Sequence, residues 1–287
     1  TIPPPNPKHA VAFKMVLGDQ IAEAKVVDVI WTPSKDGFLK PRVQIEPVVI
    51  GGVEISYATG FNAKFIEDNK IGVGALIKLV RSGDVIPHIM SVVQPAVQAQ
   101  MPTVPYEWNE THVDVLLKNI DDNEVVREKR ILQFFKTIGV VGVGKGHVKK
   151  MIAAGYNTVP KILSLSVATL KEIEGFQQKT AENIAQGIKD RLAIVQLPII
   201  MHASNIFSPP GEEDKGAKSS LGTRKFAAIL KKWPSILVST ESPEEKIAMV
   251  NQVSGMGIKT ATKFVKRINS FVKWMIESKL ESRLEFE

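Results

Sequence analysis

Glycine and lysine occur together at three places in the second half of the chain, at a spacing that suits the binding of phosphate. The segments are Gly142-Val143-Gly144-Lys145, Gly175-Phe176-Gln177-Gln178-Lys179 and Gly255-Met256-Gly257-Ile258-Lys259-Thr260. Glycine accepts positive φ and leaves neighbouring backbone N–H groups uncovered. When such a turn opens a helix, these unpaired N–H groups and the helix dipole favour an anion. The three segments are therefore predicted to bind phosphate groups, with the lysines adding positive charge.

The same segments form an internal repeat, which predicts a helix-hairpin-helix at each copy. One apolar residue, Val143, Phe176 or Met256, stands between the two turn positions and is expected to fill the core of its hairpin. Gly222 belongs to a weaker copy. In the second copy Gln177 replaces the second glycine, so this turn is expected to be structural or to bind through fewer amides. Repeated turns of this kind indicate contact with the backbone of duplex DNA, whatever its base sequence.

The first half of the chain adds basic residues around a predicted strand pair at Leu76–Pro87. Its two strands are joined by the turn Ser82-Gly83-Asp84. Lys78 and Arg81 differ by three, so in a strand they point to opposite faces, and one of them could face a polyanion. Lys78, Arg81 and Asp84 are thus candidate DNA contacts. The alternative is an ordinary hairpin with solvated charges.

Few residues suit catalysis or metal binding. The five histidines share no metal-ligand spacing, so each is expected at the surface or in a helix cap. Glu212, Glu213 and Asp214 lie together in a polar segment, where they are expected to be solvated. The chain has no cysteine, which excludes disulfides and thiolate zinc sites. It contains no Walker loop and no hydrolase nucleophile elbow.

Length and charge restrict the class of protein. The 287 residues suffice for two or more compact domains. Lys and Arg outnumber Asp and Glu by 37 to 30, a net charge of +7 that favours a polyanionic partner. No apolar run approaches the roughly 18 residues of a membrane span, and no signal peptide is present. A cytosolic protein is expected.

The residue pattern predicts a multidomain α and β chain, with a small β-barrel followed by an all-α domain. Alternating segments bounded by turn residues predict short strands, and residues 62–69 predict one helix between them. Five or six strands with an inserted helix match the plan of an OB-fold, which often binds oligonucleotides. The strands are expected at 10–14, 25–31, 42–50, 53–58, 76–81 and 85–93.

Changes in composition suggest the domain boundaries. Residues 1–9 are proline-rich and are expected to be an extended lead-in. The OB-fold is expected over 10–93, and the polar, proline-spaced segment 94–111 is predicted to be a linker. Helical periodicity then predicts a tandem helix-hairpin-helix domain over 112–275, followed by a tail, 276–287.

The barrel, the linker and the glycine repeats together resemble one family, the NAD-dependent DNA ligases, in the part that follows their nucleotidyltransferase domain. The resemblance covers about residues 10–272. The matching residues are Ala10-Val11-Ala12-Phe13-Lys14, Ile45-Glu46-Pro47-Val48, Gly51-Gly52-Val53, Ala58-Thr59 with Asn62-Ala63, and Arg81-Ser82-Gly83-Asp84-Val85-Ile86-Pro87.

The resemblance implies a DNA-clamping role in the sealing of nicks. Lys14 would contact the adenylate phosphate, the barrel would close over the nick, and the glycine hairpins would hold the flanking duplex. The complete family enzyme uses NAD and Mg²⁺. The implied DNA contacts are Lys35, Lys78, Arg81, Asp84, Gly142, Gly144, Lys145, Gly175, Lys179, Gly222, Gly255, Gly257, Lys259 and Thr260.

The chain also departs from the family pattern. The family's four zinc-binding cysteines are missing, so no zinc is expected, and packing of Tyr106 and Trp108 could replace the metal. Lys35 stands where the family has an arginine near the DNA backbone, and a lysine cannot reproduce its bidentate fork. The Lys-x-Asp-Gly motif that accepts AMP, the NAD-binding domain before it and the family's C-terminal phosphopeptide-type domain are not found in the sequence.

These departures predict a chain that is not adenylated or active alone. It is expected to need a nucleotidyltransferase and NAD-binding half, either on another chain or in a missing N-terminal part. Two non-enzymatic alternatives have the same architecture: a Holliday-junction-binding protein and a degenerate ligase remnant that only binds DNA. The first does not explain the Ala12-Phe13-Lys14 and Arg81–Pro87 segments, and intact Lys14 and Asp84 argue against the second.

Overall fold

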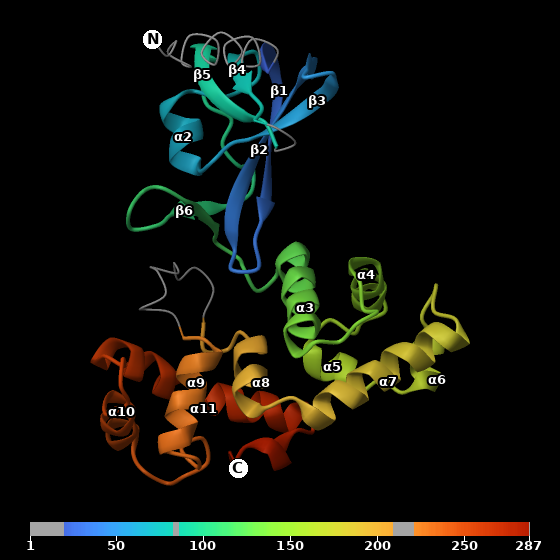
Figure 1. Ribbon diagram of the computed structural model, residues 1–287, viewed down its shortest axis with the longest axis vertical. Helices are drawn as coiled ribbons and strands as arrows, with labels where there is room; N and C mark the ends of the chain where they lie inside the picture. The colour runs from blue at the N-terminus through green and yellow to red at the C-terminus, as the bar shows by residue number, and fades with distance from the viewer. Residues whose placement is uncertain (1–19, 83–85, 209–220, 287) are drawn as a thin grey trace, which may run out of the picture. The chain divides into compact units, whose positions relative to one another are not determined.

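The computed structural model of the protein describes residues 20–82, 86–208 and 221–286. The chain forms two compact units that divide between Ile120 and Asp121, and each is described by itself (Figure 1). The strand expected at 10–14, the residues Gly83 and Asp84 of the predicted turn, and the acidic cluster 212–214 lie outside the described residues.

The first unit contains a closed five-stranded barrel. Its strands are β1 (Ile21–Pro33), β2 (Phe38–Ile50), β3 (Val53–Thr59), β4 (Leu76–Val80) and β5 (His88–Gln94). The sheet order is β1-β4-β5-β3-β2, and pairing of β1 with β2 closes it. The β3–β5 pair is parallel, and the other neighbours are antiparallel. This topology is that of the expected OB-fold.

The barrel core follows from the alternation of apolar residues along each strand. Val43 and Ile45 of β2 point inward with Ile77 and Leu79 of β4, and all four are almost fully buried. Helix α2 (Ala63–Asp68) begins at Asn62, whose side chain accepts the N–H of Phe65 at 2.8 Å. Ile66 of this helix joins the same core. The helix predicted at 62–69 is thus confirmed between β3 and β4.

The segment predicted to be a linker, 94–111, differs from the expectation. The backbone N–H groups of Ala96 and Gln100 donate to the carbonyls of Lys70 and Ile71, which hold residues 96–100 against the barrel. Two further short strands, β6 (Tyr106–Trp108) and β7 (Val115–Leu117), extend the sheet beyond β2. The polar, proline-rich composition concealed this role, because its contacts are made mainly through the backbone.

Hairpin β6–β7 occupies the part of the chain where family zinc ligands were sought. Trp108 stacks on His112 with ring centroids 3.8 Å apart. The side chain of Asn109 accepts the N–H groups of Val113 and Asp114 at 3.0 and 3.1 Å. Asp114 in turn lies 3.7 Å from the ammonium group of Lys40 on β2. Aromatic stacking and a side-chain-capped turn therefore order this hairpin.

In residues 121–208 and 221–286 of the second unit, every regular element is a helix. Its longer helices are α3 (Glu124–Ile138), α7 (Gln178–Ile194) and α11 (Ile258–Glu277). The shorter helices are α4 (Lys145–Ala153), α5 (Val159–Leu163), α6 (Val167–Glu172), α8 (Leu197–Ala203), α9 (Thr223–Lys232) and α10 (Pro243–Asn251), with the 3₁₀ turn η1 (Glu281–Arg283). Together with the barrel, this confirms the expected fold class.

One apolar core runs through the helical unit. Phe207, after α8, contacts the rings of Phe226, Phe264 and Phe271 with centroid distances of 5.1, 4.9 and 5.2 Å. The residues expected to form a tail are also packed: Leu284 is buried, and the guanidinium of Arg283 donates to the carbonyls of Leu192 and Val195. The helical unit thus continues past the predicted limit at 275.

Candidate nucleic-acid interface

The first hairpin joins α3 to α4. Gly142 has φ of +96°, a left-handed conformation that favours glycine, and Gly144 is the N-cap of α4 with an extended backbone (φ −102°, ψ 177°). Val143 between them is buried, as the repeat predicts. The N–H of Gly144 donates to Nδ1 of His147 at 3.1 Å. Burial and, to a lesser extent, the charge of Lys145 lower the pKa of Lys129 on α3.

The second hairpin joins α6 to α7 and packs on the first. Gly175 has φ of +89°, Phe176 is buried, and Gln177 is the N-cap of α7 (φ −95°, ψ 167°). The ring of Phe176 lies 5.5 Å from that of His147. The Lys150 side chain crosses Gly175 so closely that a Cβ there would lie 2.4 Å from its Nζ. This turn therefore has a protein neighbour.

The last of the four repeats along the chain, the fourth hairpin, joins α10 to α11. Its backbone conformation matches that of the second hairpin. Gly255 has φ of +82°, Met256 is buried, and Gly257 is the N-cap of α11 (φ −86°, ψ 170°). A Cβ added at Gly255 or Gly257 would meet no described atom within 4 Å. The turn is therefore open on the side where a side chain would project.

The third copy lies between α8 and α9. Gly222 is the N-cap of α9 with an extended backbone, and a Cβ there would also meet no described atom within 4 Å. The first turn position of this copy falls outside the described residues. The predicted start of the helix after this weaker repeat is therefore present, whereas only part of the turn before it lies in the described residues.

Three of the four helices before the turns begin differently from the helices after them. Helices α3, α6 and α10 start at Asn123, Ser166 and Ser242, and each of these side chains accepts a backbone N–H of the first helical turn. Helix α8, before the third turn, starts without such a bond. Helices α4, α7, α9 and α11 start at residues that make no such side-chain bond. A helix N-terminus without a side-chain cap retains N–H donors for another acceptor. This difference supports an anion at the helices that follow the turns.

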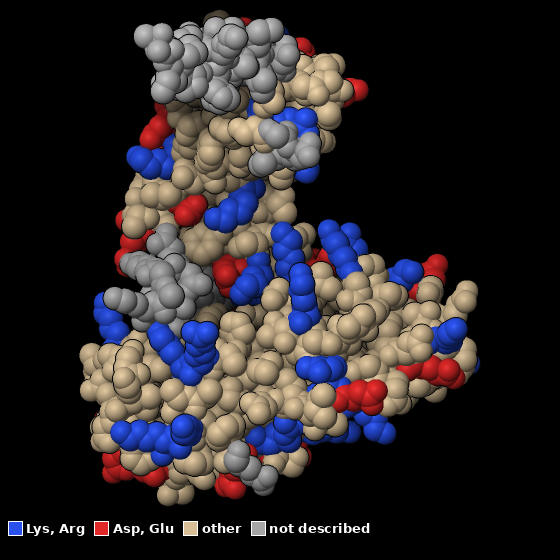
Figure 2. Space-filling model, viewed as in Figure 1, with Lys and Arg blue, Asp and Glu red and all other residues tan. Residues whose placement is uncertain are grey.

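Charges at the helix starts show a similar contrast for two of the preceding helices, α3 and α10. Acidic residues suit the positive end of a helix dipole, and α3 and α10 carry Glu124, Glu244 and Glu245 in their first turns. The first turns of α4, α7, α9 and α11 hold no acidic residue. They carry exposed Lys145, Lys179, Arg224 and Lys259 instead. A positive charge at the positive end of the helix dipole destabilises each of these helices, and a bound anion would offset this destabilisation. Figure 2 shows basic side chains standing over α3 and α4.

The DNA contacts predicted in the barrel lie in different surroundings from one another. Lys78 points out of the barrel, opposite Glu23 of β1 in the strand register. Lys35 lies in the β1–β2 turn, 3.6 Å from the carboxylate of Asp36. Arg81 follows the end of β4, and its Nη1 would lie 3.8 Å from a Cβ on Gly51. The alternation argument applies to Lys78 and does not extend to Arg81, because β4 ends at Val80.

Two predicted site residues, Lys14 and Asp84, lie outside the described residues, and Thr260 is half-buried in the first turn of α11. Sequence reasoning did not single out His147, although its position three residues after Gly144 is the N3 position of a helix, where a side chain can reach back to the N-cap. It also passed over Phe61 as a functional residue. Phe61 is a non-glycine residue with φ of +61° and a side chain that is 47% exposed.

Comparison with known proteins agrees with this architecture. Residues 23–101 match the model of the NAD-dependent DNA ligase OB-fold domain, and residues 134–190 match a SAM-like helix-hairpin-helix tandem. The OB-fold and helix-hairpin-helix domains of this chain are those of an NAD-dependent DNA ligase. The second match covers the first two hairpins of the chain, and the fourth hairpin has a backbone like that of the second.

Relatives extend the similarity over most of the chain. It is 38% identical over 272 residues to a DNA ligase of Acanthamoeba polyphaga mimivirus, covering 94% of this chain and 41% of the relative. It is 31% identical over 263 residues to a putative DNA ligase of Invertebrate iridescent virus 6, covering 90% and 38%. With a DNA ligase of Persephonella marina the identity is 28% over 200 residues, covering 64% and 28%. The chain thus spans less than half the length of these relatives.

Cofactors of the ligase family find no complete site in the described residues. No group of three or more His, Cys, Asp or Glu side chains in residues 20–82, 86–208 and 221–286 could hold a metal ion. These residues therefore do not fit a resident Mg²⁺ held by protein ligands alone. Among the described helices, none is long and apolar enough to cross a membrane.

Proposed function

We propose that this chain is the DNA-clamping half of an NAD-dependent DNA ligase that seals nicks in duplex DNA. The observation that carries the proposal is the common start of α4, α9 and α11, with no side-chain cap, no acid in the first turn and a basic residue instead. Helix α7 begins in the same way, but the Lys150 side chain crosses the turn before it, so α7 is not counted among the phosphate sites. Such starts suit DNA phosphates, which are bound without regard to sequence. The described hairpins supply this feature repeatedly along one domain.

The barrel has a different part in the proposal. Arg81 lies beside the β2–β3 turn, and Ile86, in the same Arg81–Pro87 segment, is 71% exposed. A cation and an exposed apolar side chain in one segment suit a nick, where phosphate and sugar surfaces are both accessible. Lys35 would meet the backbone from the β1–β2 turn. Lys14 and Asp84 are proposed contacts on the evidence of the family resemblance alone.

Chemistry requires a second component. In the proposal, a nucleotidyltransferase and NAD-binding half, on another chain or in a longer form of this one, carries the lysine that takes AMP from NAD. AMP then passes to the 5′-phosphate of the nick, and the 3′-hydroxyl displaces it with formation of the phosphodiester bond. Mg²⁺ would act among the phosphates of the complete enzyme. The expected site of action is the cytoplasm of a bacterial or phage-infected cell, or a viral replication site.

Nick sealing with a labelled duplex, NAD and Mg²⁺ tests the proposal. The chain is assayed alone and then mixed with the matched nucleotidyltransferase half of a close relative. We expect ligation only in the mixture, and none when Lys14→Ala is used, although this variant should bind duplex DNA like the parent. Salt-sensitive duplex binding without ligation in any mixture would favour a non-catalytic DNA-binding protein. Ligation by the chain alone would contradict the need for a second half.

A further inference from the structure

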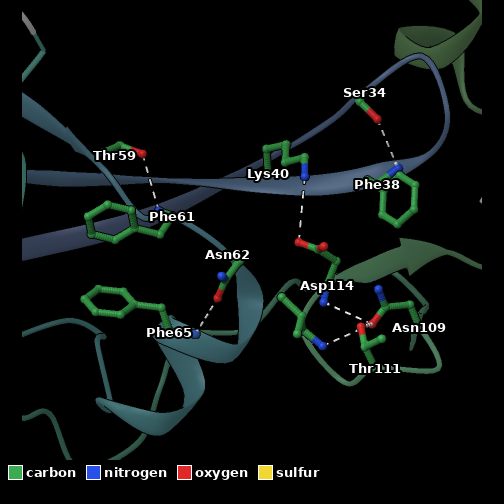
Figure 3. Close-up of polar contacts among 11 residues, drawn as sticks. Ser34, Phe38, Lys40, Thr59, Phe61, Asn62, Phe65, Asn109, Thr111 and Asp114 are labelled. Atoms are coloured by element: carbon green, nitrogen blue, oxygen red, sulfur yellow. Dashed lines mark hydrogen bonds and ion pairs between the residues drawn. The ribbon is translucent and has the colours of Figure 1, made fainter. Parts of the chain in front are cut away.

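The outer face of β3 and the start of α2 carry aromatic side chains at the barrel surface. Figure 3 shows the rings of Phe61 and Phe65 projecting on the same side of the backbone. They meet edge to face, with centroids 4.9 Å apart, and the His88 ring lies 6.4 Å from Phe61. Phe65 also packs against the barrel core, so it supports the more exposed ring from below.

Phe61 has an unfavourable backbone for its residue type. Its φ of +61° lies in the left-handed region, which asparagine and glycine enter more readily than phenylalanine. The conformation is held by its N–H bond to Thr59 Oγ1 at 3.3 Å and by the Asn62 cap one residue later. The fold thus retains a half-exposed aromatic ring where a smaller residue would be less strained. Strain of this kind at an exposed side chain points to a role outside folding.

A cation on the outward face of β2, paired in register with Thr59 two residues before Phe61, favours a nucleic acid. Arg42 on β2 places its guanidinium 4.2 Å from the centre of the Tyr57 ring. Tyr57 and Thr59 lie on the same outward face of β3, and Thr59 pairs with both Arg42 and His88 in the sheet. Exposed rings next to a cation are the usual surface on which unpaired bases stack while the cation meets the backbone. The β2–β3 face is also the side of an OB-fold that binds oligonucleotides.

We propose that Phe61, supported by Phe65 and flanked by Arg42 with Tyr57, is a stacking platform for an unpaired nucleobase. The chain would then bind single-stranded segments, such as a frayed strand at a nick or a gap, in addition to duplex DNA. This goes beyond the duplex clamp and rests on the proposed function only for the chemical class of the ligand. It does not require that any hairpin bind phosphate.

The test uses the full chain with two probes. One is a short single strand containing 2-aminopurine, whose fluorescence is quenched by stacking, and the other is a blunt duplex. We expect Phe61→Ala to weaken single-strand binding about tenfold and to remove the quenching. Phe61→Tyr should retain both, because it keeps a ring. Duplex affinity should be unchanged in either variant.

Two further variants control for folding. Phe61→Asn removes the ring and suits the left-handed backbone, so it should lose single-strand binding without a lower melting temperature. Val73→Ala removes another exposed apolar side chain of the barrel and should change nothing. Unchanged single-strand affinity in Phe61→Ala, or an equal loss with both probes, would overturn the stacking platform. So would a loss confined to assembly with a nucleotidyltransferase half, since that assigns the rings to a protein contact.

The outcome is separable from the proposed function. A change of Gly257 that weakens duplex binding would support the hairpin clamp whatever Phe61 does. Conversely, single-strand binding that depends on the Phe61 ring, together with duplex binding that is unaffected by changes in the hairpins, would support the stacking platform and contradict the hairpin clamp.

Discussion

The second and fourth hairpins have nearly the same backbone and different surroundings. Gly175 and Gly255 share a left-handed φ, and Gln177 and Gly257 share an extended N-cap. Each turn is followed by Lys-Thr, at 179–180 and 259–260. Since glutamine adopts the N-cap conformation at 177, glycine at 257 is not required by the backbone. What glycine adds at 257 is space in front of the helix.

This difference assigns separate tasks to the two turns. The second turn is crossed by Lys150, and its plug Phe176 lies against His147 of the first hairpin. The fourth turn has no described atom within 4 Å of either added Cβ. We infer that the second hairpin mainly fixes the position of the first, whereas the fourth holds a phosphate. From the glycine pattern alone, both turns would be interpreted as phosphate sites, the second one weaker than the fourth.

Adding a negative charge at the N-caps of α7 and α11 is expected to give the largest difference in duplex affinity between the two hairpins. Gly257→Asp should weaken duplex binding by about 1–3 kcal/mol, roughly 5- to 150-fold, because the carboxylate would take the place of a phosphate. The same change should raise helix stability by a few tenths of a kcal/mol, since aspartate is a favourable N-cap. Fluorescence anisotropy and thermal unfolding measure the two effects.

The matched control for that change is Gln177→Asp. It adds the same charge to the same backbone conformation, so its effect on stability should be similar and its effect on duplex binding small. Equal losses of affinity in the two variants would remove the distinction between the hairpins.

The left-handed glycines are expected to matter equally in both hairpins, but for folding. Gly255→Ala and Gly175→Ala should each lower the free energy of unfolding by about 1–2 kcal/mol, because a Cβ is unfavourable at φ near +85°. The flexible end of Lys150 can move away from the methyl group added in Gly175→Ala, so no large extra cost arises there. Urea denaturation followed by circular dichroism measures both. Gly146→Ala, a change at a helical glycine with open space, is the control and should not destabilise α4.

Much of this fold followed from the sequence. Period-two strands and the helix before Leu76 gave the barrel, and the repeated glycine turns gave the hairpins with their buried plugs Val143, Phe176 and Met256. The role of residues 94–117 did not follow, because strand β7 and the bonds of Gln100 depend on partners far away in the chain. The protein contacts of Gly175 and the left-handed Phe61 were hidden for the same reason: both are set by tertiary packing.

Replacing Lys179 or Lys259 is expected to give a smaller difference between the two hairpins, seen in the salt dependence of duplex binding. Lys259→Ala should reduce the slope of log affinity against log salt by about one unit, as expected for the loss of one phosphate contact. Lys179→Ala should leave the slope nearly unchanged if the second hairpin does not touch DNA. Titrations of one duplex at several salt concentrations provide both slopes. A larger change for Lys179 than for Lys259 would reverse the assignment.

The smallest effect is expected from Gln177→Gly, which gives the second hairpin the glycine spacing of the fourth. The extended backbone at 177 accepts glycine without strain, and the cost to folding should be only a few tenths of a kcal/mol. If the Gln177 side chain alone kept phosphate away, duplex affinity should rise several-fold and the salt slope should steepen. We expect less than a twofold change, because Lys150 and the neighbouring first hairpin still border the turn. Exclusion of phosphate from this hairpin would then lie in its packing, which a single glycine does not undo.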